Sequence, residues 1–230
     1  GEFSSSSFGG NIGVLEFTSG SEEADSIIKK ASIAADNVDD SVTFGYQFFD
    51  TSMEEYLLRK ANIKRELDKA AYDPQDQSIH MVYQPIIDKD GDICCFEALV
   101  RFRSPTMGLM KPDEFIPISE ESQLIVPLGK KIMQQVFGFL NRLDTLGFDQ
   151  VGMSINISAI QLLQEGFVAD LKQMVAAAGI DPNRLILEIT ESIFTNNYKA
   201  LKQKLSRIQK LGIKIAIDDF GTGYSSFARE

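Results

Sequence analysis

Five oxygen-bearing side chains stand at the ends of apolar segments of the chain, where they could bind a cation. They are Glu97, Asn156, Glu188, Asp218 and Asp219. The last two are adjacent, and neighbouring carboxylates in a strand repel each other and resist the loss of water. We therefore expect this pair to hold something positive. Oxygen ligands without histidine or cysteine favour Mg²⁺ or Mn²⁺ over zinc or copper.

The chemistry that such a set supports is metal-assisted hydrolysis. Asp218 and Asp219 could bridge two ions, an arrangement that activates water for in-line attack on a phosphodiester. Arg101, four residues after Glu97, is a candidate phosphate clamp. A magnesium-dependent lyase on a barrel is an alternative, but it needs a lysine base at a strand end, and Lys214 lies too early in its strand.

Strand and helix patterns alternate after residue 78. Apolar runs bounded by turn residues predict strands over 81–88, 93–102, 151–158, 184–190 and 213–221. Helical spacing predicts two helices within 112–146, broken near Pro127, one helix over 159–179 that stops at Gly179, and one over 198–212 that ends at Gly212. This alternation implies right-handed crossovers and a parallel α/β sheet, either doubly wound or closed into a (β/α) barrel.

The candidate ligands share one position, because each lies towards the C-terminal end of its predicted strand. Active sites of barrels form at that end. Alternation along a strand also places polar residues on one face and apolar residues on the other. The polar or small face is predicted to hold Ser154, Asn156, Ser158, Glu188, Thr190, Ala216 and Asp218. A single strand-end acid more often caps a helix or faces solvent, so the set carries the signal rather than any one member.

The first part of the chain predicts a smaller α+β segment. Residues 1–8 resemble a cloning remnant, and residues 9–52 are typical of a strand, a helix and a second strand. A connector helix and linker follow over 53–77, and we place the domain boundary in the turn-rich stretch 73–78. The apolar face of that helix is expected to contain Met53, Tyr56, Leu57, Ala61, Leu67 and Ala70.

Composition argues against several classes of function. The formal net charge is -10 and the isoelectric point is about 4.7, so bulk DNA or RNA binding is not expected, although a small anionic ligand is compatible. The adjacent Cys94 and Cys95 provide no disulfide framework and no zinc site, which favours a reducing, cytoplasmic compartment. No run reaches the ~18 apolar residues that a membrane span needs.

Six motifs resemble those of the EAL domain family and occur in the same order. They are YQPI at 83–86, EALVR at 97–101, PDEFIPISEES at 112–122, SINIS at 154–158, LEITES at 187–192 and DDFGTGYSS at 218–226. The resemblance implies a modified TIM barrel that hydrolyses cyclic di-GMP to the linear dinucleotide pGpG with Mg²⁺ or Mn²⁺.

The same resemblance assigns roles to individual residues. It implies that Glu97, Asn156, Glu188 and Asp218 bind a first metal, and that Asp218 and Asp219 face a second. Glu191 corresponds to the acid that steadies the loop at 220–226, and Glu97, Asp218, Asp219 and Glu191 are the implied catalytic set. Gln84, Leu99 and Arg101 match positions that touch the dinucleotide.

Residues 9–52 resemble the last segment of a GGDEF domain, without its signature loop, so no cyclase activity is expected. The EAL-like region over 78–230 has five predicted strands, whereas a closed barrel needs eight. The barrel is therefore expected to be incomplete at its C-terminal end, and the chain to hydrolyse weakly or not at all, with the activity in a longer parent. Two alternatives stay open: a module that binds cyclic di-GMP without cleaving it, and a half-barrel completed by a second chain as a homodimer.

Overall fold

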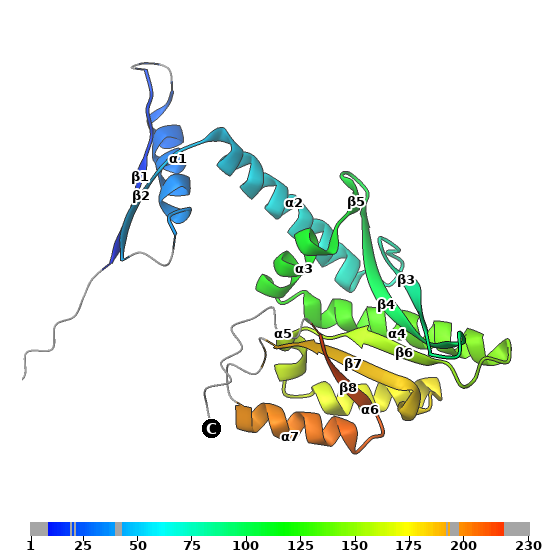
Figure 1. Cartoon of the computed structure of the whole chain (residues 1–230). Coiled ribbons are helices and arrows are strands. Elements are labelled where there is room, and N and C mark those ends of the chain that lie inside the picture. The colour runs from blue at the N-terminus through cyan, green and yellow to red at the C-terminus, as the bar shows by residue number, and fades with distance from the viewer. Residues whose placement is uncertain are drawn as a thin grey trace, which may run out of the picture. The chain divides into compact units, whose positions relative to one another are not determined.

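The computed structural model describes residues 9–18, 20, 22–39, 43–191, 193 and 198–218, except for the side chains of 198–200. The chain divides into two compact units, residues 1–62 and 63–230; Figure 1 labels their elements. None of the described helices is both long enough and apolar enough to cross a bilayer.

The first unit contains a parallel strand pair and a helix. β1 (Gly10–Val14) pairs with β2 (Phe44–Phe48), and α1 (Ala24–Asp36) connects them. The helix packs closely on the pair at Gly13, where an added Cβ would lie 1.7 Å from the carbonyl oxygen of Ala31. The glycine permits this approach because it has no side chain. The strand–helix–strand order expected from the sequence is therefore present.

The second unit begins within α2 (Thr51–Tyr72), the helix predicted as a connector. Its buried residues are Ile63, Leu67 and Ala70. They belong to a hydrophobic cluster that also contains Phe102 and Phe115. Helical spacing assigned Tyr56 and Leu57 to the apolar face, but these side chains are 58% and 38% exposed. The residues of α2 that are fully buried lie in its C-terminal half.

Lys131 holds the end of α2. Its Nζ donates hydrogen bonds to the carbonyl oxygens of Ala70 (2.9 Å), Asp73 (3.1 Å) and Asp76 (2.6 Å). The last carbonyls of a helix have no partner within the helix itself. The turn-rich stretch after α2 is therefore fixed by a cation on a later helix.

The second unit is built on a six-stranded sheet in the order β3-β4-β6-β7-β8, with β5 paired to β4. The strands are β3 (Ile79–Ile87), β4 (Ile93–Ser104), β5 (Gly108–Met110), β6 (Gly152–Asn156), β7 (Leu185–Thr190) and β8 (Lys214–Asp218). β4, β6, β7 and β8 run parallel, as the alternation of elements predicts. β3 and β5 are antiparallel to β4, which corrects the expectation of a wholly parallel sheet.

The short connection between β3 and β4 explains the antiparallel pair. Residues 88–92 form the turn, in which the N–H of Asp88 donates to the carbonyl of Asp92 at 2.9 Å. The Asp88 carboxylate accepts from the N–H of Asp90 at 2.9 Å. A parallel pair needs a crossover of about a dozen residues or more, so this turn produces a hairpin.

Helices connect the parallel strands. They are α3 (Pro112–Glu121), α4 (Ile125–Thr145), α5 (Ala159–Leu163), α6 (Phe167–Ala178), the 3₁₀ turn η1 (Pro182–Arg184) and α7 (Tyr198–Gln209). The break between α3 and α4 falls at 122–124 rather than near Pro127. Gln123 adopts a φ of 60° there, whereas Pro127 lies in the first turn of α4, where a helix needs no N–H donor.

The single helix predicted over 159–179 is two helices, α5 and α6, separated at 164–166. Lys204 of α7 accounts for the end of α5, because its Nζ donates to the carbonyl oxygens of Leu162 (3.1 Å), Leu163 (2.6 Å) and Gln164 (2.7 Å). The predicted stop at Gly179 is confirmed, since this residue caps α6 with a φ of 69°. α7 ends at Gln209, before Gly212, whose φ is 95°.

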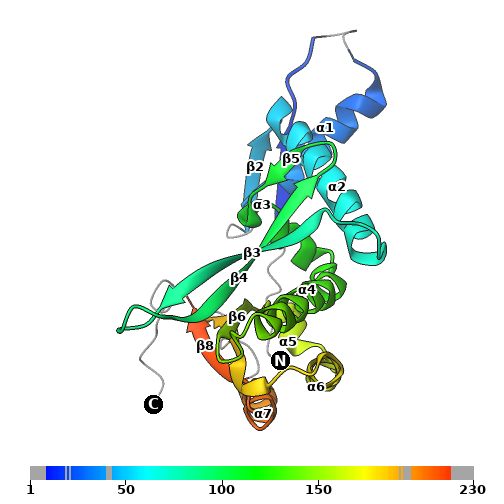
Figure 2. The same cartoon turned by 90° about the vertical axis from the view of Figure 1, so that its right-hand side faces the viewer.

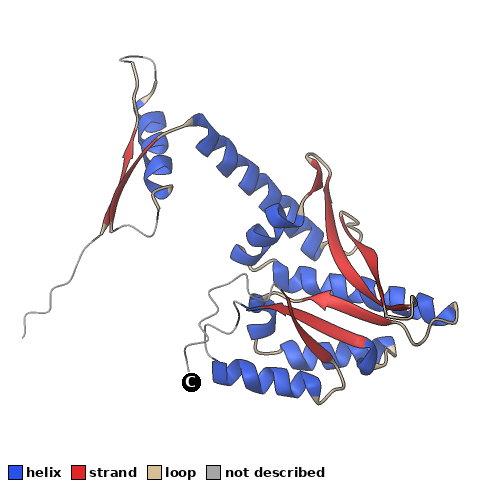
Figure 3. Ribbon diagram, in the orientation of Figure 1, coloured by secondary structure: helices blue, strands red, loops and turns tan. Residues whose placement is uncertain are grey.

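One face of the sheet carries the main core. Figures 2 and 3 show α4, α6 and α7 on the same side of the parallel strands. Buried residues of these helices pack against buried residues of β6 and β7. The strand residues that take part include Met153, Ile155, Leu185, Leu187 and Ile189. The opposite face of the parallel strands is left to the polar side chains.

Two glycines of α4 differ in what a side chain would meet. At Gly129 an added Cβ would lie 1.7 Å from Nε2 of Gln161, whereas at Gly138 nothing lies within 4 Å. We expect G138A to raise the free energy of unfolding by about 0.5–1 kcal/mol, because alanine favours a helix. G129A should lower it by roughly 1–3 kcal/mol, because the buried amide must move. Urea unfolding measures both, and equal effects would contradict this packing.

Candidate active site

Strand register brings the predicted ligands to one face of the sheet. The cross-strand pairs are Glu97–Ser154, Asn156–Glu188 and Thr190–Asp218. Gln84 of β3 stands opposite Glu97. Residues paired across neighbouring strands project from the same face. The polar face predicted from alternation is therefore continuous from β3 to β8.

Two of the carboxylates accept hydrogen bonds from their neighbours on β6. Ser154 Oγ donates to Glu188 Oε1 at 2.5 Å, and Asn156 Nδ2 donates to Glu97 Oε1 at 3.1 Å. The N–H of Ile157 donates to the carbonyl of Glu188 at 2.8 Å. β6 therefore orients the acidic side chains of both strands that flank it.

Glu188 is the acid whose environment opposes its charge. Burial raises the pKa of its carboxyl, and the negative charges of Glu97 and Asp218 raise it further, while the Ser154 hydrogen bond acts in the opposite direction. The negative charges of Glu97 and Asp218 therefore disfavour ionisation of Glu188. A cation among them would relieve this repulsion.

A cavity of about 410 Å³ lies at the C-terminal ends of the parallel strands. Three of the predicted ligands line it, namely Asn156, Glu188 and Asp218. α3 contributes Asp113 and Glu120 to the same cavity. The acidic lining means that an anionic ligand could enter only with cations that offset the charge.

The donor set fits a hard divalent cation in its chemistry, because all four described ligands offer oxygen. Within the part of the chain that the structure describes, no three histidine, cysteine, aspartate or glutamate side chains gather closely enough to hold one ion. Glu97 and Glu188 are instead engaged by Asn156 and Ser154. Asp219 and the loop 220–226 lie outside the described residues.

The residues predicted to touch the dinucleotide lie on β3 and β4. Gln84 is exposed on β3, and Leu99 and Arg101 are half-buried on β4. Arg101 Nη1 donates to the carbonyl of Val100 at 2.9 Å. Glu191 directly follows β7 and is half-buried. Leu99 and Arg101 alternate with Val100, so they project from the same face as Glu97.

The structure adds three residues for which no role in the site was expected. Ser154 binds Glu188, and Ser158 Oγ donates to Glu120 Oε1 at 2.5 Å. The period of two predicts that both serines share a face with Asn156, and this was the available signal for them. Glu120 offered no such signal, because it reaches Ser158 from a separate helix.

The family model of the EAL domain matches residues 64–229. This range contains all of the six-stranded sheet and the predicted ligands. The chain belongs to the EAL domain family. The resemblance carried by the six motifs is thereby confirmed.

Curated relatives resemble this EAL domain chain over almost all of its length. The cyclic di-GMP phosphodiesterase NbdA of Pseudomonas aeruginosa is 31% identical over 95% of the chain and 28% of its own length. An uncharacterized signaling protein of Caulobacter vibrioides is 32% identical over 96% of the chain and 26% of its own length. The chain thus spans only about a quarter of the length of these relatives.

Solved EAL domain structures share the fold. The PaMucR phosphodiesterase in complex with c-di-GMP superposes with a TM-score of 0.64 at 29% identity, covering 75% of this chain and 66% of that one. The EAL enzyme Bd1971, bound to cAMP and cyclic di-GMP, gives a TM-score of 0.65 at 31% identity, covering 74% and 47%. The predicted α/β fold of EAL type is confirmed, and the described strands form an open sheet rather than a closed barrel.

Proposed function

We propose that this EAL domain provides the active site for hydrolysis of cyclic di-GMP to linear pGpG. The observation that carries the proposal is the register of Glu97, Asn156, Glu188 and Asp218 on one sheet face, with the last three lining one cavity. Support comes from the relative named as a cyclic di-GMP phosphodiesterase and from the solved phosphodiesterase complex with c-di-GMP.

The four residues would hold Mg²⁺ or Mn²⁺, with Asp219 as a further ligand. When bound, such ions lower the pKa of a coordinated water and offset the charge of the phosphodiester. The chain's own residues limit the motion of the ligands. Ser154 restrains the Glu188 carboxylate through a charge-assisted hydrogen bond, and Asn156 and Glu97 restrain each other.

The dinucleotide would lie along β3 and β4, beside the acidic strand ends. Arg101 is proposed to bind a phosphate, because a guanidinium presents paired donors that match two phosphate oxygens. Gln84 and Leu99 would contact other parts of the dinucleotide from the same face. Glu191 is proposed to steady the loop 220–226.

Product analysis tests the proposal. The chain alone is proposed to be weakly active, so incubation with cyclic di-GMP and Mn²⁺ should form pGpG only slowly, and EDTA should stop the conversion. R101A should reduce cyclic di-GMP affinity roughly 10-fold or more, because it removes a charge-assisted contact, and leave the melting temperature within about 2 °C of wild type. Conversion to any other product, or conversion that persists in EDTA, would rule the proposal out.

Further assignments extend the proposal beyond the site. Residues 9–52 are proposed to be GGDEF-like, 53–77 to be a connector helix and linker, and 78–230 to be the N-terminal part of the EAL domain. A cytoplasmic location and a homodimer are proposed as well. Size-exclusion chromatography with light scattering tests the homodimer, and a purely monomeric mass would exclude it.

A further inference from the structure

We infer that Glu120 and Ser158 are positioning residues for Asn156, an inference that rests on the proposed role of Asn156 as a metal ligand. Ser158 follows Asn156 by two residues, at the junction where β6 has ended and α5 begins. The direction of the backbone at this junction decides where the Asn156 amide points. The contacts of Ser158 fix that direction.

Ser158 joins three segments of the chain through hydrogen bonds. Its Oγ donates to Glu120 Oε1 on α3 at 2.5 Å and accepts from the N–H of Ile160 at 3.2 Å. Its N–H donates to Gln161 Oε1 at 3.1 Å. The bond to Glu120 therefore ties the end of β6 to α3.

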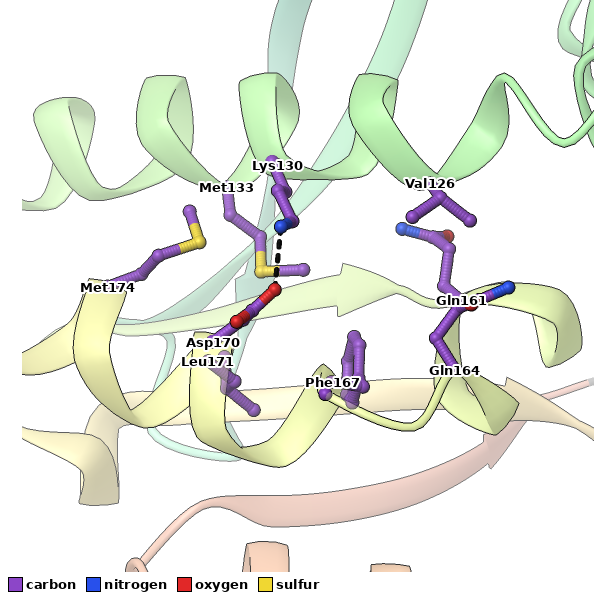
Figure 4. A pocket seen from close by; sticks show the side chains of 10 residues that line it. Val126, Lys130, Met133, Gln161, Gln164, Phe167, Asp170, Leu171 and Met174 are labelled. Carbon is purple, nitrogen blue, oxygen red and sulfur yellow. Dashed lines mark ion pairs between the residues drawn. The ribbon is translucent and has the colours of Figure 1, made fainter.

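Gln161 carries the network to α4. Its side chain is 5% exposed, and its amide lies over Gly129, where an added Cβ would be 1.7 Å from Nε2. Gln161 also lines a second cavity of about 200 Å³ between α4 and α6. Figure 4 shows this cavity, which the Lys130–Asp170 ion pair (2.6 Å) crosses. The hydrogen bonds of Ser158 therefore continue, through Gln161, to the packed helices α4 and α6.

The junction is also fixed on its other side. The N–H of Ile157 donates to the Glu188 carbonyl at 2.8 Å, so the residue between Asn156 and Ser158 is bound to β7. The two residues after Asn156 are therefore both held by hydrogen bonds, Ile157 to β7 and Ser158 to α3. Outer groups that orient a metal ligand commonly change affinity or activity 10–100-fold when removed.

Glu120 has a second conceivable role, because its carboxylate lines the same cavity as Asn156 and Glu188. As a ligand it would need its negative charge. As a positioning residue it needs only an oxygen that accepts from Ser158. Glutamine keeps the acceptor and lacks the charge, so E120Q distinguishes the two roles.

Four variants of the whole chain test the inference. E120A removes the acceptor, and E120Q keeps it. S158D retains a good helix cap but sets a second carboxylate against Glu120, whereas S158T keeps the hydroxyl. Titration calorimetry should show Mn²⁺ affinity reduced roughly 10–100-fold in E120A and S158D, and within about threefold of wild type in E120Q and S158T.

Hydrogen exchange at the Ile157 amide provides a readout that needs neither metal nor activity. In metal-free buffer it should be about 10-fold faster in E120A and S158D and unchanged in the conservative variants. If wild type does not bind Mn²⁺, the proposed function is wrong. The exchange rates of the variants would still show whether Glu120 and Ser158 position Asn156. Unchanged exchange in all four variants, or equal loss of Mn²⁺ affinity in E120Q and E120A, would overturn the inference.

Discussion

The E188Q variant is expected to lose Mn²⁺-dependent cyclic di-GMP hydrolysis by roughly 100-fold or more and to melt at a higher temperature than wild type. A neutral amide is a poor substitute for a carboxylate ligand of a hard cation. The same change removes a partly buried charge that stands near Glu97 and Asp218. The amide oxygen can still accept from Ser154, so the local hydrogen bond is retained.

The gain in stability should depend on pH. Burial, with Glu97 and Asp218, raises the pKa of Glu188 above its ordinary value of 4.5. The folded chain then holds this proton more tightly than the unfolded chain, so wild-type stability falls as pH rises from 4.5 through the raised pKa. The E188Q variant has no carboxyl to titrate at this position, so this fall in stability does not occur in it. The difference in melting temperature should be near zero below that window and about 1–3 °C above it, a small value because water screens a partly exposed group.

Glu55 supplies the matched control for E188Q. It is an exposed glutamate on α2, so E55Q should change neither hydrolysis nor melting temperature. Melting curves at several pH values, with product analysis of the same preparations, measure both effects. A lower melting temperature for E188Q at neutral pH would contradict the repulsion among the three carboxylates.

The F102A variant is expected to lower the free energy of unfolding by about 3–5 kcal/mol, because it leaves a cavity in a closed cluster. Phe102 is 0% exposed, and it pairs in register with Ile79 on one side and Met110 on the other. Its ring meets that of Phe115 edge-on, with centroids 5.4 Å apart. Buried residues of the same cluster surround the ring, so a large effect is expected.

The same variant tests where the second unit begins. Because Ile63 and Leu67 share the cluster with Phe102, F102A should speed hydrogen exchange in the α2 residues 63–72. L109A is the control, since Leu109 is 60% exposed on β5 and its truncation should cost less than about 0.5 kcal/mol. Unchanged exchange in 63–72 would place that half of the helix outside the unit.

The polar face of the sheet could be predicted from the sequence because side-chain direction has a strict period of two along a strand. Asn156 and Glu188 were assigned to one face on that basis, and the register places them opposite each other. The parallel strands followed from the lengths of their helical connections. Strand spacing therefore predicts the shared face of the described ligands. Glu97, however, lies in the N-terminal half of β4 rather than towards its C-terminal end, because β4 continues to pair with β5.

The remaining features depend on contacts between distant parts of the chain. The break before α6 follows from Lys204, which reaches the carbonyls of Leu163 and Gln164 from α7. The partner of Ser158 is Glu120, which lies 38 residues earlier. Local spacing carries no signal for such pairs. The hairpin of β3 and β4 is different, because the aspartates and glycine at 88–92 are turn residues that indicate it locally.

Calorimetric titration with cyclic di-GMP, in Mn²⁺ and in EDTA, tests most directly whether these strand ends form a metal-dependent phosphodiesterase site. We expect binding that requires Mn²⁺, pGpG in the same samples, and loss of the product in E188Q. Equal binding in Mn²⁺ and in EDTA, with no pGpG formed, would contradict hydrolysis and favour a module that binds cyclic di-GMP without cleaving it.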